Sequence, residues 1–172
     1  ARLDRVRDLF LVGCYTGLRF SDLTGLRIEN ISKDKKVIKV RTLKTDETVV
    51  IPINSIIQNI IDKYDGHLPT AISNEKMNAY LKELGKEAEL NEQIEVIYTK
   101  GGKRVRELFE KWELITVHTA RRSFATNAYL SLVPAISIMK ITGHRTEKNF
   151  LKYIKISQED NANKLINHPF FT

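Results

Sequence analysis

The sequence predicts a mainly helical α+β domain that contains a small three-stranded antiparallel sheet. Apolar residues recur at helical spacing in several long segments. Short runs of alternating apolar residues, separated by polar turns, stand between two of these segments. Glycine, proline and small polar residues mark many of the segment boundaries, where they start or stop helices. The chain has 172 residues, so we expect a single domain over residues 1–172.

The chain opens with two predicted helices. Residues 2–16 carry apolar side chains at helical spacing, and Gly17 is expected to end this helix. Ser21 is expected to cap a short second helix that runs to Leu26. Arg19 therefore falls at the junction between two helices.

Two regions predict β-structure. Three β-like runs separated by polar turns predict the three-stranded sheet: residues 27–31, 37–42 and 48–53. Further along, Ile94, Val96 and Tyr98 alternate with polar residues and lead to Gly101 and Gly102. This pattern predicts a β-hairpin whose return strand carries several basic residues.

The remaining segments predict helices with recognisable ends. Five residues are expected to cap, open or close them: Asn54, Ser73, Pro134, Gly143 and Thr146. A helix after His118 precedes the one that begins near Pro134. The last predicted helix of this group starts near Thr146 and carries Tyr153.

The composition favours a polyanionic partner. Lysine and arginine number 28 against 21 aspartates and glutamates, which gives a net charge of +7. Nucleic acid is the commonest such partner, although ribosome-associated and membrane-surface proteins share this balance. No apolar run approaches the ~20 residues of a membrane span, so we expect a cytoplasmic protein without a membrane segment.

Two further features concern the compartment and the chain ends. Cys14 is the single cysteine, which excludes an internal disulfide and fits a small buried side chain in a reducing cytoplasm. The sequence lacks an initiator methionine and begins within a helical pattern. We therefore expect a fragment that lacks an N-terminal portion.

Four short segments contain side chains suited to phosphate chemistry. They are TGLRFSDL with Arg19, TLKTDET with Lys44, HTARRSFAT with His118 and Arg121, and GHRTEKNFLKY with His144 and Tyr153. Each alone has an ordinary structural interpretation, such as an ion pair, a solvated turn lysine or a core tyrosine. Their order and spacing together are more specific.

Across almost the whole chain, these segments resemble the catalytic domain of tyrosine recombinases, the phage-integrase family. The stretches CYTGLRFSDL and HTARRSFATN are most similar to integrases of phage and conjugative transposons. The resemblance implies the catalytic-domain fold of that family and six catalytic residues: Arg19, Lys44, His118, Arg121, His144 and the nucleophile Tyr153. It also implies that Asp22 supports the site without taking part in the chemistry.

The chemistry explains these residue types. Attack by the Tyr153 oxygen on a DNA phosphodiester conserves the bond energy for rejoining, so no ATP is needed. Arg19 and Arg121 would bind the non-bridging oxygens, where negative charge develops. His118 would accept the tyrosine proton, and Lys44 would protonate the leaving 5′ oxygen.

The remaining histidine, His144, is expected to donate a hydrogen bond to a phosphate oxygen. His118 and His144 could also suggest zinc, but no cysteine or carboxylate stands beside them at ligand spacing. We therefore expect no metal and no cofactor. Arg122 and Thr142 depart from the residues often found there in the family, and the Thr142 change suggests altered packing.

The resemblance implies site-specific recombination through a 3′-phosphotyrosine intermediate, with integration or excision of a mobile element. Double-stranded DNA is the expected partner, bound by a homotetramer on two duplexes in which each C-terminal tail docks on a neighbouring protomer. The portion expected to be missing from this fragment is the family's N-terminal arm and core-binding region.

Four basic residues are weaker candidates for DNA contacts, and a solvated face explains them equally well: Lys103, Arg104, Arg122 and Arg145. Alternatives are DNA relaxation of the type IB topoisomerase kind and a non-catalytic basic DNA-binding module.

Overall fold

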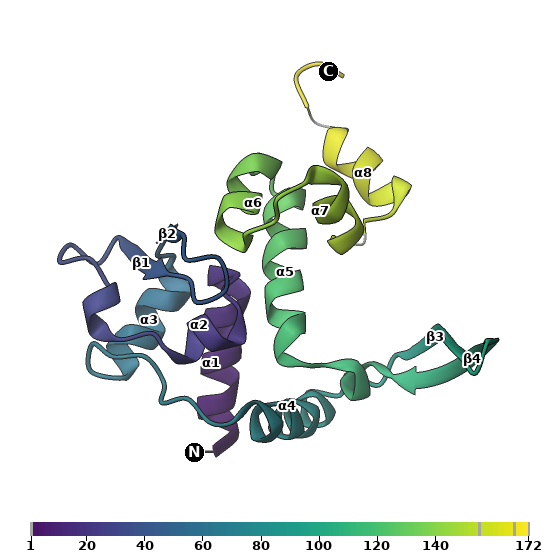
Figure 1. Cartoon of the computed structure of the whole chain (residues 1–172), viewed down its shortest axis with the longest axis horizontal. Coiled ribbons are helices and arrows are strands. Elements are labelled where there is room, and N and C mark those ends of the chain that lie inside the picture. The colour runs from purple at the N-terminus through teal and green to yellow at the C-terminus, as the bar shows by residue number, and fades with distance from the viewer. Residues whose placement is uncertain (1, 155, 167, 172) are drawn as a thin grey trace.

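The computed structural model describes residues 2–154, 156–166 and 168–171. The mainly helical α+β class is confirmed (Figure 1). The elements follow in the order α1 (Arg2–Thr16), α2 (Phe20–Thr24), η1 (Ile28–Asn30), β1 (Val37–Arg41), β2 (Thr48–Pro52), α3 (Ser55–Lys63), α4 (Asn74–Glu87), β3 (Gln93–Lys100), β4 (Lys103–Glu110), η2 (Lys111–Leu114), α5 (Val117–Leu130), α6 (Ala135–Thr142), α7 (Glu147–Tyr153) and α8 (Gln158–Leu165).

The first apolar core lies among α1, α3, α4 and the β1–β2 hairpin. Ile38 of β1 pairs with Ile51 of β2 in antiparallel register, and both side chains are buried. Ile57 and Ile61 of α3 are buried in the same cluster. Burial of each such side chain stabilises the fold by about 1.5–3 kcal/mol. This core fixes α1 and the hairpin relative to each other.

The predicted strand over residues 27–31 is wrong. This segment forms the 3-10 helix η1, and in the part of the chain that is described the sheet contains β1 and β2, with one isolated bridge between Ile31 and Ile38. The Asn30 side chain accepts a hydrogen bond from the Arg27 N–H at 2.8 Å and donates one to the Lys39 carbonyl at 2.9 Å. Asn30 thus satisfies backbone groups that a third strand would pair.

The predicted cap at Ser21 is also wrong. Gly17 ends α1 with a φ of +64°, where a Cβ would meet the Phe124 ring at 2.3 Å. Arg19 then has extended backbone and stands at the N-cap of α2, which begins at Phe20. Ser21 therefore lies inside the helix, where its carbonyl accepts a hydrogen bond from the Thr24 hydroxyl. The expected position of Arg19 between two helices is confirmed.

Helix α2 ends at Thr24, two residues before the predicted end at Leu26, whereas the five predicted boundary residues of the later helices are confirmed. Asn54 accepts a hydrogen bond from the Ile57 N–H, and Ser73 accepts one from the Lys76 N–H. Thr146 caps α7 in the same way. Pro134 precedes α6, and Gly143 ends it in a left-handed conformation.

A second apolar cluster joins α5, α6 and α7. Its buried residues are Ala125, Ile138, Met139, Phe150 and Ile154. Helix α5 packs along α1 and continues to the α6–α8 end of the molecule, so that it connects the two clusters (Figure 1). Helix α8 lies against α5 of the same chain, with Lys164 Nζ 3.6 Å from the centroid of the Tyr129 ring.

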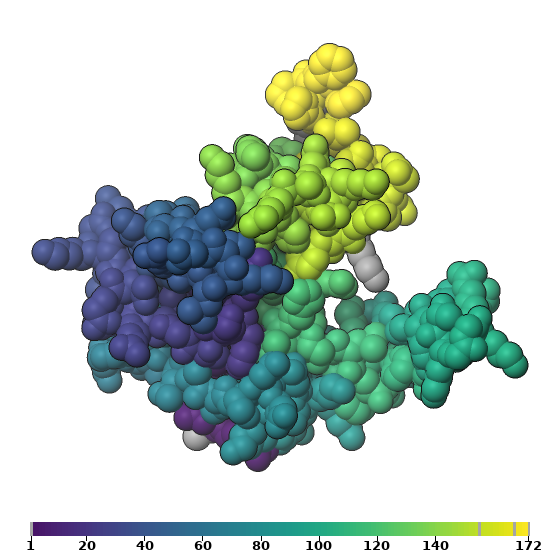
Figure 2. Space-filling model, viewed as in Figure 1, coloured from purple at the N-terminus to yellow at the C-terminus, as the bar shows by residue number. Residues whose placement is uncertain are grey.

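The β3–β4 hairpin projects from the body of the molecule (Figures 1 and 2). It confirms the predicted hairpin, with Gly101 and Gly102 between its strands. Most of its side chains are exposed. The hairpin therefore contributes little to either apolar cluster.

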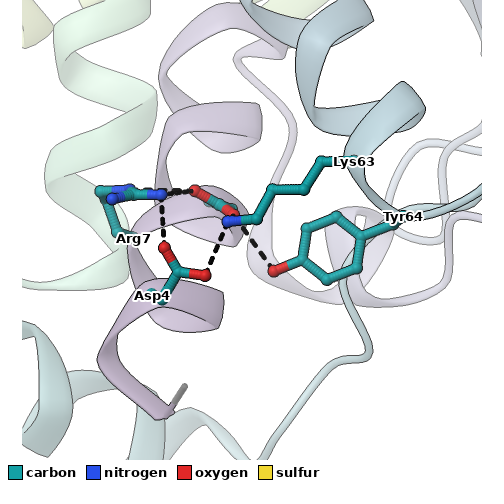
Figure 3. A network of polar contacts seen from close by, with 5 residues as sticks. Asp4, Arg7, Lys63 and Tyr64 are labelled. Carbon is teal, nitrogen blue, oxygen red and sulfur yellow. Dashed lines mark hydrogen bonds and ion pairs between the residues drawn. The ribbon is translucent and has the colours of Figure 1, made fainter.

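A polar network joins α1 to α3 (Figure 3). Asp8 is buried, and its carboxylate accepts hydrogen bonds from Arg7, Lys63 and Tyr64. Lys63 also contacts Asp4 at 2.6 Å. Although burial alone would raise the pKa of Asp8, the hydrogen bonds from Lys63, Arg7 and Tyr64 lower it. The paired charge holds α1 in a fixed position on α3.

The structure also describes the single cysteine and the length of the helices. Cys14 is half-buried, and burial raises the pKa of its thiol to about 12. Within residues 2–154, 156–166 and 168–171, no helix has both the length and the apolar character needed to cross a bilayer.

Candidate active site

One pocket brings together all six residues that the sequence suggested for catalysis. It has a volume of about 480 Å³ and is lined by Arg19, Lys44, His118, Arg121, His144 and Tyr153 together with Leu18, Phe20 and Val117. Arg19 and Lys44 come from the side of the first apolar cluster, whereas the other four lie on or next to α5 and α7. The pocket therefore forms where the two clusters meet.

Arg121 lies in the second turn of α5 and is 6% exposed. Its Nη1 donates to the Gly17 carbonyl at 2.6 Å, and its Nη2 donates to the Thr142 carbonyl. These contacts join α5 to the ends of α1 and α6. A guanidinium has five N–H donors, so three remain for other acceptors.

Arg19 reaches the pocket from the junction of α1 and α2. Its guanidinium lies over Gly143, where an added Cβ would approach Arg19 Nη2 to 3.3 Å. Gly143 also has a φ of +64°, a conformation that favours glycine. A larger residue at Gly143 would therefore disturb both the backbone turn before His144 and the position of Arg19.

Lys44 lies exposed in the turn between β1 and β2. The base of this turn is attached to α2, because the buried Asp22 accepts a hydrogen bond from the Leu43 N–H at 2.8 Å. The other carboxylate oxygen of Asp22 has no hydrogen-bond partner among the described residues. Asp22 thus connects the helix after Arg19 to the residue before Lys44.

Tyr153 is the last residue of α7, and its ring contacts two histidines. The ring centroids of Tyr153 and His118 are 5.4 Å apart, and those of Tyr153 and His144 are 4.7 Å apart. The hydroxyl is buried and has no hydrogen-bond partner among the described residues. Burial raises the pKa of Tyr153, although the charges of Arg121 and Arg122 oppose this effect. The phenol is therefore protonated at neutral pH.

Both histidines of the pocket are held neutral. Burial lowers the pKa of His118, and Arg122 and Arg121 lower it further. Burial likewise lowers the pKa of His144, with Arg121, Arg19 and His118 acting in the same direction. His118 lies in the first turn of α5, three residues before Arg121, so the two side chains are neighbours on the helix surface. A neutral imidazole can accept a proton.

The four weaker basic candidates occupy different places. The Arg122 guanidinium lies 5.4 Å from the centroid of the Tyr153 ring, so this residue is next to the proposed nucleophile. Arg145 is exposed in the segment between His144 and α7. Lys103 and Arg104 lie near the tip of the β3–β4 hairpin and do not line the pocket.

Thr142 is a site residue whose role the sequence did not indicate. It is fully buried, its carbonyl accepts from Arg121, and its hydroxyl lies 2.8 Å from His144 Nδ1. The departure of Thr142 from the residue often found at this position in the family was the available signal. The packing interpretation was incomplete, because the hydroxyl contacts a catalytic candidate.

The described part of the chain contains no group of three or more His, Cys, Asp or Glu side chains able to hold a metal ion. The pocket instead presents guanidinium and imidazole groups around one phenol. Such a set can bind an oxyanion and move protons.

A family model and a curated relative both identify this chain as similar to phage integrases and tyrosine recombinases. The family model described as "Phage integrase family" matches residues 4–160. The tyrosine recombinase XerA of Pyrococcus horikoshii is 29% identical over 157 residues, which cover 90% of this chain and 52% of that protein. The chain thus spans about half the length of this curated relative.

Solved structures show the same fold. A crystal structure of XerA recombinase matches with a TM-score of 0.67 and 17% identity, over 96% of this chain and 63% of the other. The XerH site-specific recombinase bound to a palindromic difH substrate matches with a TM-score of 0.65 and 15% identity, over 95% and 45%. The Tn1549 transposon integrase in complex with circular intermediate DNA matches with a TM-score of 0.57 and 20% identity, over 96% and 58%.

Proposed function

Because this chain belongs to the phage integrase family of tyrosine recombinases, we propose that it cleaves and rejoins DNA in site-specific recombination. The proposed intermediate is a covalent bond between Tyr153 and a DNA 3′ phosphate. The observation that carries the proposal is the single pocket lined by all six candidate catalytic residues. They come from segments up to 134 positions apart (153 − 19) and converge on a space of about 480 Å³.

The two arginines provide the phosphate site in this proposal. Arg121 is fixed by the Gly17 and Thr142 carbonyls, so its remaining donors are already oriented. Arg19 is held over Gly143 at the same pocket. Preorganised donors stabilise the charge that develops on the non-bridging oxygens without having to reorient during the reaction.

The proton transfers follow from the protonation states. Tyr153 Oη attacks the phosphorus and forms the phosphotyrosine bond, while the bond to the 5′ oxygen breaks. The tyrosine proton passes to neutral His118, and Lys44 supplies a proton to the 5′ oxygen. Asp22 supports this last step by holding the backbone of Leu43. Rejoining reverses each transfer, so neither ATP nor a metal ion is required.

We propose double-stranded DNA as the partner, with a homotetramer on two duplexes and integration or excision of a mobile element as the biological reaction. The net charge of +7 supports a DNA partner. Similarity to a transposon integrase supports the mobile-element role. Exposed apolar residues at the C-terminal end support docking of the tail on a neighbouring protomer: Ile166 at 61%, Phe170 at 82% and Phe171 at 62% exposure.

The two alternative functions predict different reaction products. A type IB topoisomerase-like enzyme would relax supercoiled DNA without pairing two sites. A non-catalytic DNA-binding module would bind DNA and form no adduct. The intact set of six side chains in one pocket favours catalysis over simple binding.

The test uses duplexes that carry a nick beside the crossover region. Cleavage then releases a short strand with a free 5′ hydroxyl, which diffuses away, so the covalent adduct cannot be rejoined and accumulates. A pool of duplexes randomised across the crossover covers many candidate target sequences at once. We expect a covalent protein–DNA band with this chain and none with Tyr153→Phe, which should bind DNA equally well. Equal binding with no adduct from either protein would refute the enzymatic proposal.

A further inference from the structure

The end of α6 places Thr142 between two functional groups. Its hydroxyl oxygen lies 2.8 Å from the Ile138 carbonyl oxygen and 2.8 Å from His144 Nδ1. The side chain is 0% exposed, so water does not compete for these contacts. Thr142 also accepts a hydrogen bond from Arg121 through its carbonyl. One buried residue therefore contacts both a candidate arginine and a candidate histidine of the pocket.

The hydrogen atoms in this group can be counted. A threonine hydroxyl has one hydrogen to donate, and a carbonyl oxygen can only accept. The Ile138 carbonyl must therefore receive the Thr142 hydrogen. The contact between Thr142 Oγ1 and His144 Nδ1 then needs its hydrogen from the imidazole. Nδ1 is the protonated nitrogen, and a neutral ring carries its lone pair on Nε2.

We propose that Thr142 is a positioning residue that fixes His144 as the Nδ1–H tautomer and leaves Nε2 as a hydrogen-bond acceptor toward the pocket. This assignment changes the role expected for His144. A phosphate oxygen is an acceptor, so an unprotonated Nε2 cannot donate to it. His144 then contributes to phosphate binding only after it takes up a proton.

The surroundings of the ring favour the neutral form before DNA binds. The charged or titratable groups that line the pocket with His144 are Arg19, Lys44, His118, Arg121 and Tyr153. Burial and the nearby positive groups lower the pKa of His144. The apolar Phe150 ring also packs against His144, with ring centroids 5.6 Å apart. A bound phosphate adds negative charge beside the ring and favours the protonated form.

The tautomer itself can be tested without DNA. Nitrogen-15 chemical shifts of histidine-labelled protein distinguish a protonated from an unprotonated ring nitrogen, and His144→Gln assigns the signal. We expect Nδ1–H in this chain and in Thr142→Ser, which keeps the hydroxyl. Thr142→Val preserves the shape but offers no acceptor to Nδ1, so we expect the signal to change to Nε2–H. Nε2–H in the unmodified chain, or the same tautomer in Thr142→Val, would overturn the proposal.

The consequence for DNA rests on the proposed function and has a separate readout. In a Tyr153→Phe background, calorimetric titration with duplex DNA in buffers of different ionisation enthalpy measures the protons taken up on binding. We expect smaller uptake in Thr142→Val, because its neutral Nε2–H can already donate to phosphate. Thr142→Ser should restore the original uptake. Unchanged uptake in Thr142→Val would refute proton-coupled binding by His144.

These measurements separate the two proposals. Failure of adduct formation in the cleavage assay would leave the tautomer result intact. An Nε2–H tautomer would overturn the role of Thr142 while leaving Tyr153 as the proposed nucleophile. Loss of folding in Thr142→Val would appear in its circular dichroism spectrum. In that case, the Thr142→Ser protein and the unmodified chain still decide the tautomer.

Discussion

Arg121 donates a hydrogen bond through Nη1 to the carbonyl oxygen of Gly17 at 2.6 Å, although the two residues are 104 positions apart. Gly17 ends α1, and Arg19 follows two residues later. The contact therefore places one arginine of the pocket against the backbone that carries the other. Because the guanidinium also binds the Thr142 carbonyl, it joins three segments that line the site.

The first prediction concerns the shape of this side chain. Arg121→Lys keeps the charge but loses the forked donors, so the carbonyl contacts and the phosphate contacts cannot be made together. We expect covalent adduct formation to fall by about 10²–10³. Arg122→Lys, at the adjacent exposed position, is the matched control and should cause a much smaller loss. Equal losses in the two variants would argue against a specific role for Arg121.

A second prediction follows from the lowered pKa of His118, whose ordinary value is 6.5. The neutral ring accepts the tyrosine proton, so activity is lost as the pH falls through the lowered pKa. In a His144→Gln background, we expect the second-order rate of adduct formation to reach half its plateau below pH 6.5. Arg122→Gln removes one cause of the shift and should move this midpoint upward. A midpoint above 6.5, or one that Arg122→Gln leaves unchanged, would contradict the assignment.

The third prediction tests Lys44 as the general acid. Lys44→Ala should slow cleavage of a normal phosphodiester strongly, because the 5′ oxygen is a poor leaving group unless it is protonated. A substrate with sulfur at the 5′ bridging position needs no such proton, because a thiolate leaves readily. We expect this substrate to restore cleavage by Lys44→Ala but not by Arg121→Lys. Failure to rescue Lys44→Ala would remove Lys44 from this role.

A fourth prediction concerns the C-terminal tail. Helix α8 packs on α5 of its own chain, whereas Phe170 and Phe171 beyond it are exposed. Deletion of residues 168–172 should therefore reduce strand exchange between two sites more than cleavage of a single half-site. Deletion from residue 160 onward also removes most of α8 and serves as a control for loss of the internal contact. Equal loss of both reactions in the shorter deletion would contradict docking on a neighbouring protomer.

The sequence allowed much of the helical framework to be predicted. Asn54, Ser73 and Thr146 act through local hydrogen bonds to the backbone three residues later, and such contacts depend on nearby sequence. The strand predicted over residues 27–31 failed because the Asn30 side chain binds the backbone of Arg27 and Lys39. That competition depends on a residue nine positions away and is not visible in the apolar pattern.

The residues of the site could be predicted from the sequence, but the contacts between them could not. Four short segments resembled one family, and the six residues they contain line one pocket. The sequence could not indicate that Arg121 binds the Gly17 carbonyl, because this contact depends on how α1 and α5 pack. The contact between Thr142 and His144 is local and depends on the left-handed turn at Gly143 between them. The close approach of Arg122 to Tyr153 is likewise a result of packing between α5 and α7.

The most direct test of the account is the identity of the residue that becomes attached to DNA. The adduct formed on nicked duplexes is digested with nuclease and protease, and the modified peptide is sequenced by mass spectrometry. We predict a nucleotide on the peptide that contains Tyr153, joined through the phenolic oxygen. Attachment to any other residue would contradict the central claim, as would full retention of adduct formation by Tyr153→Phe.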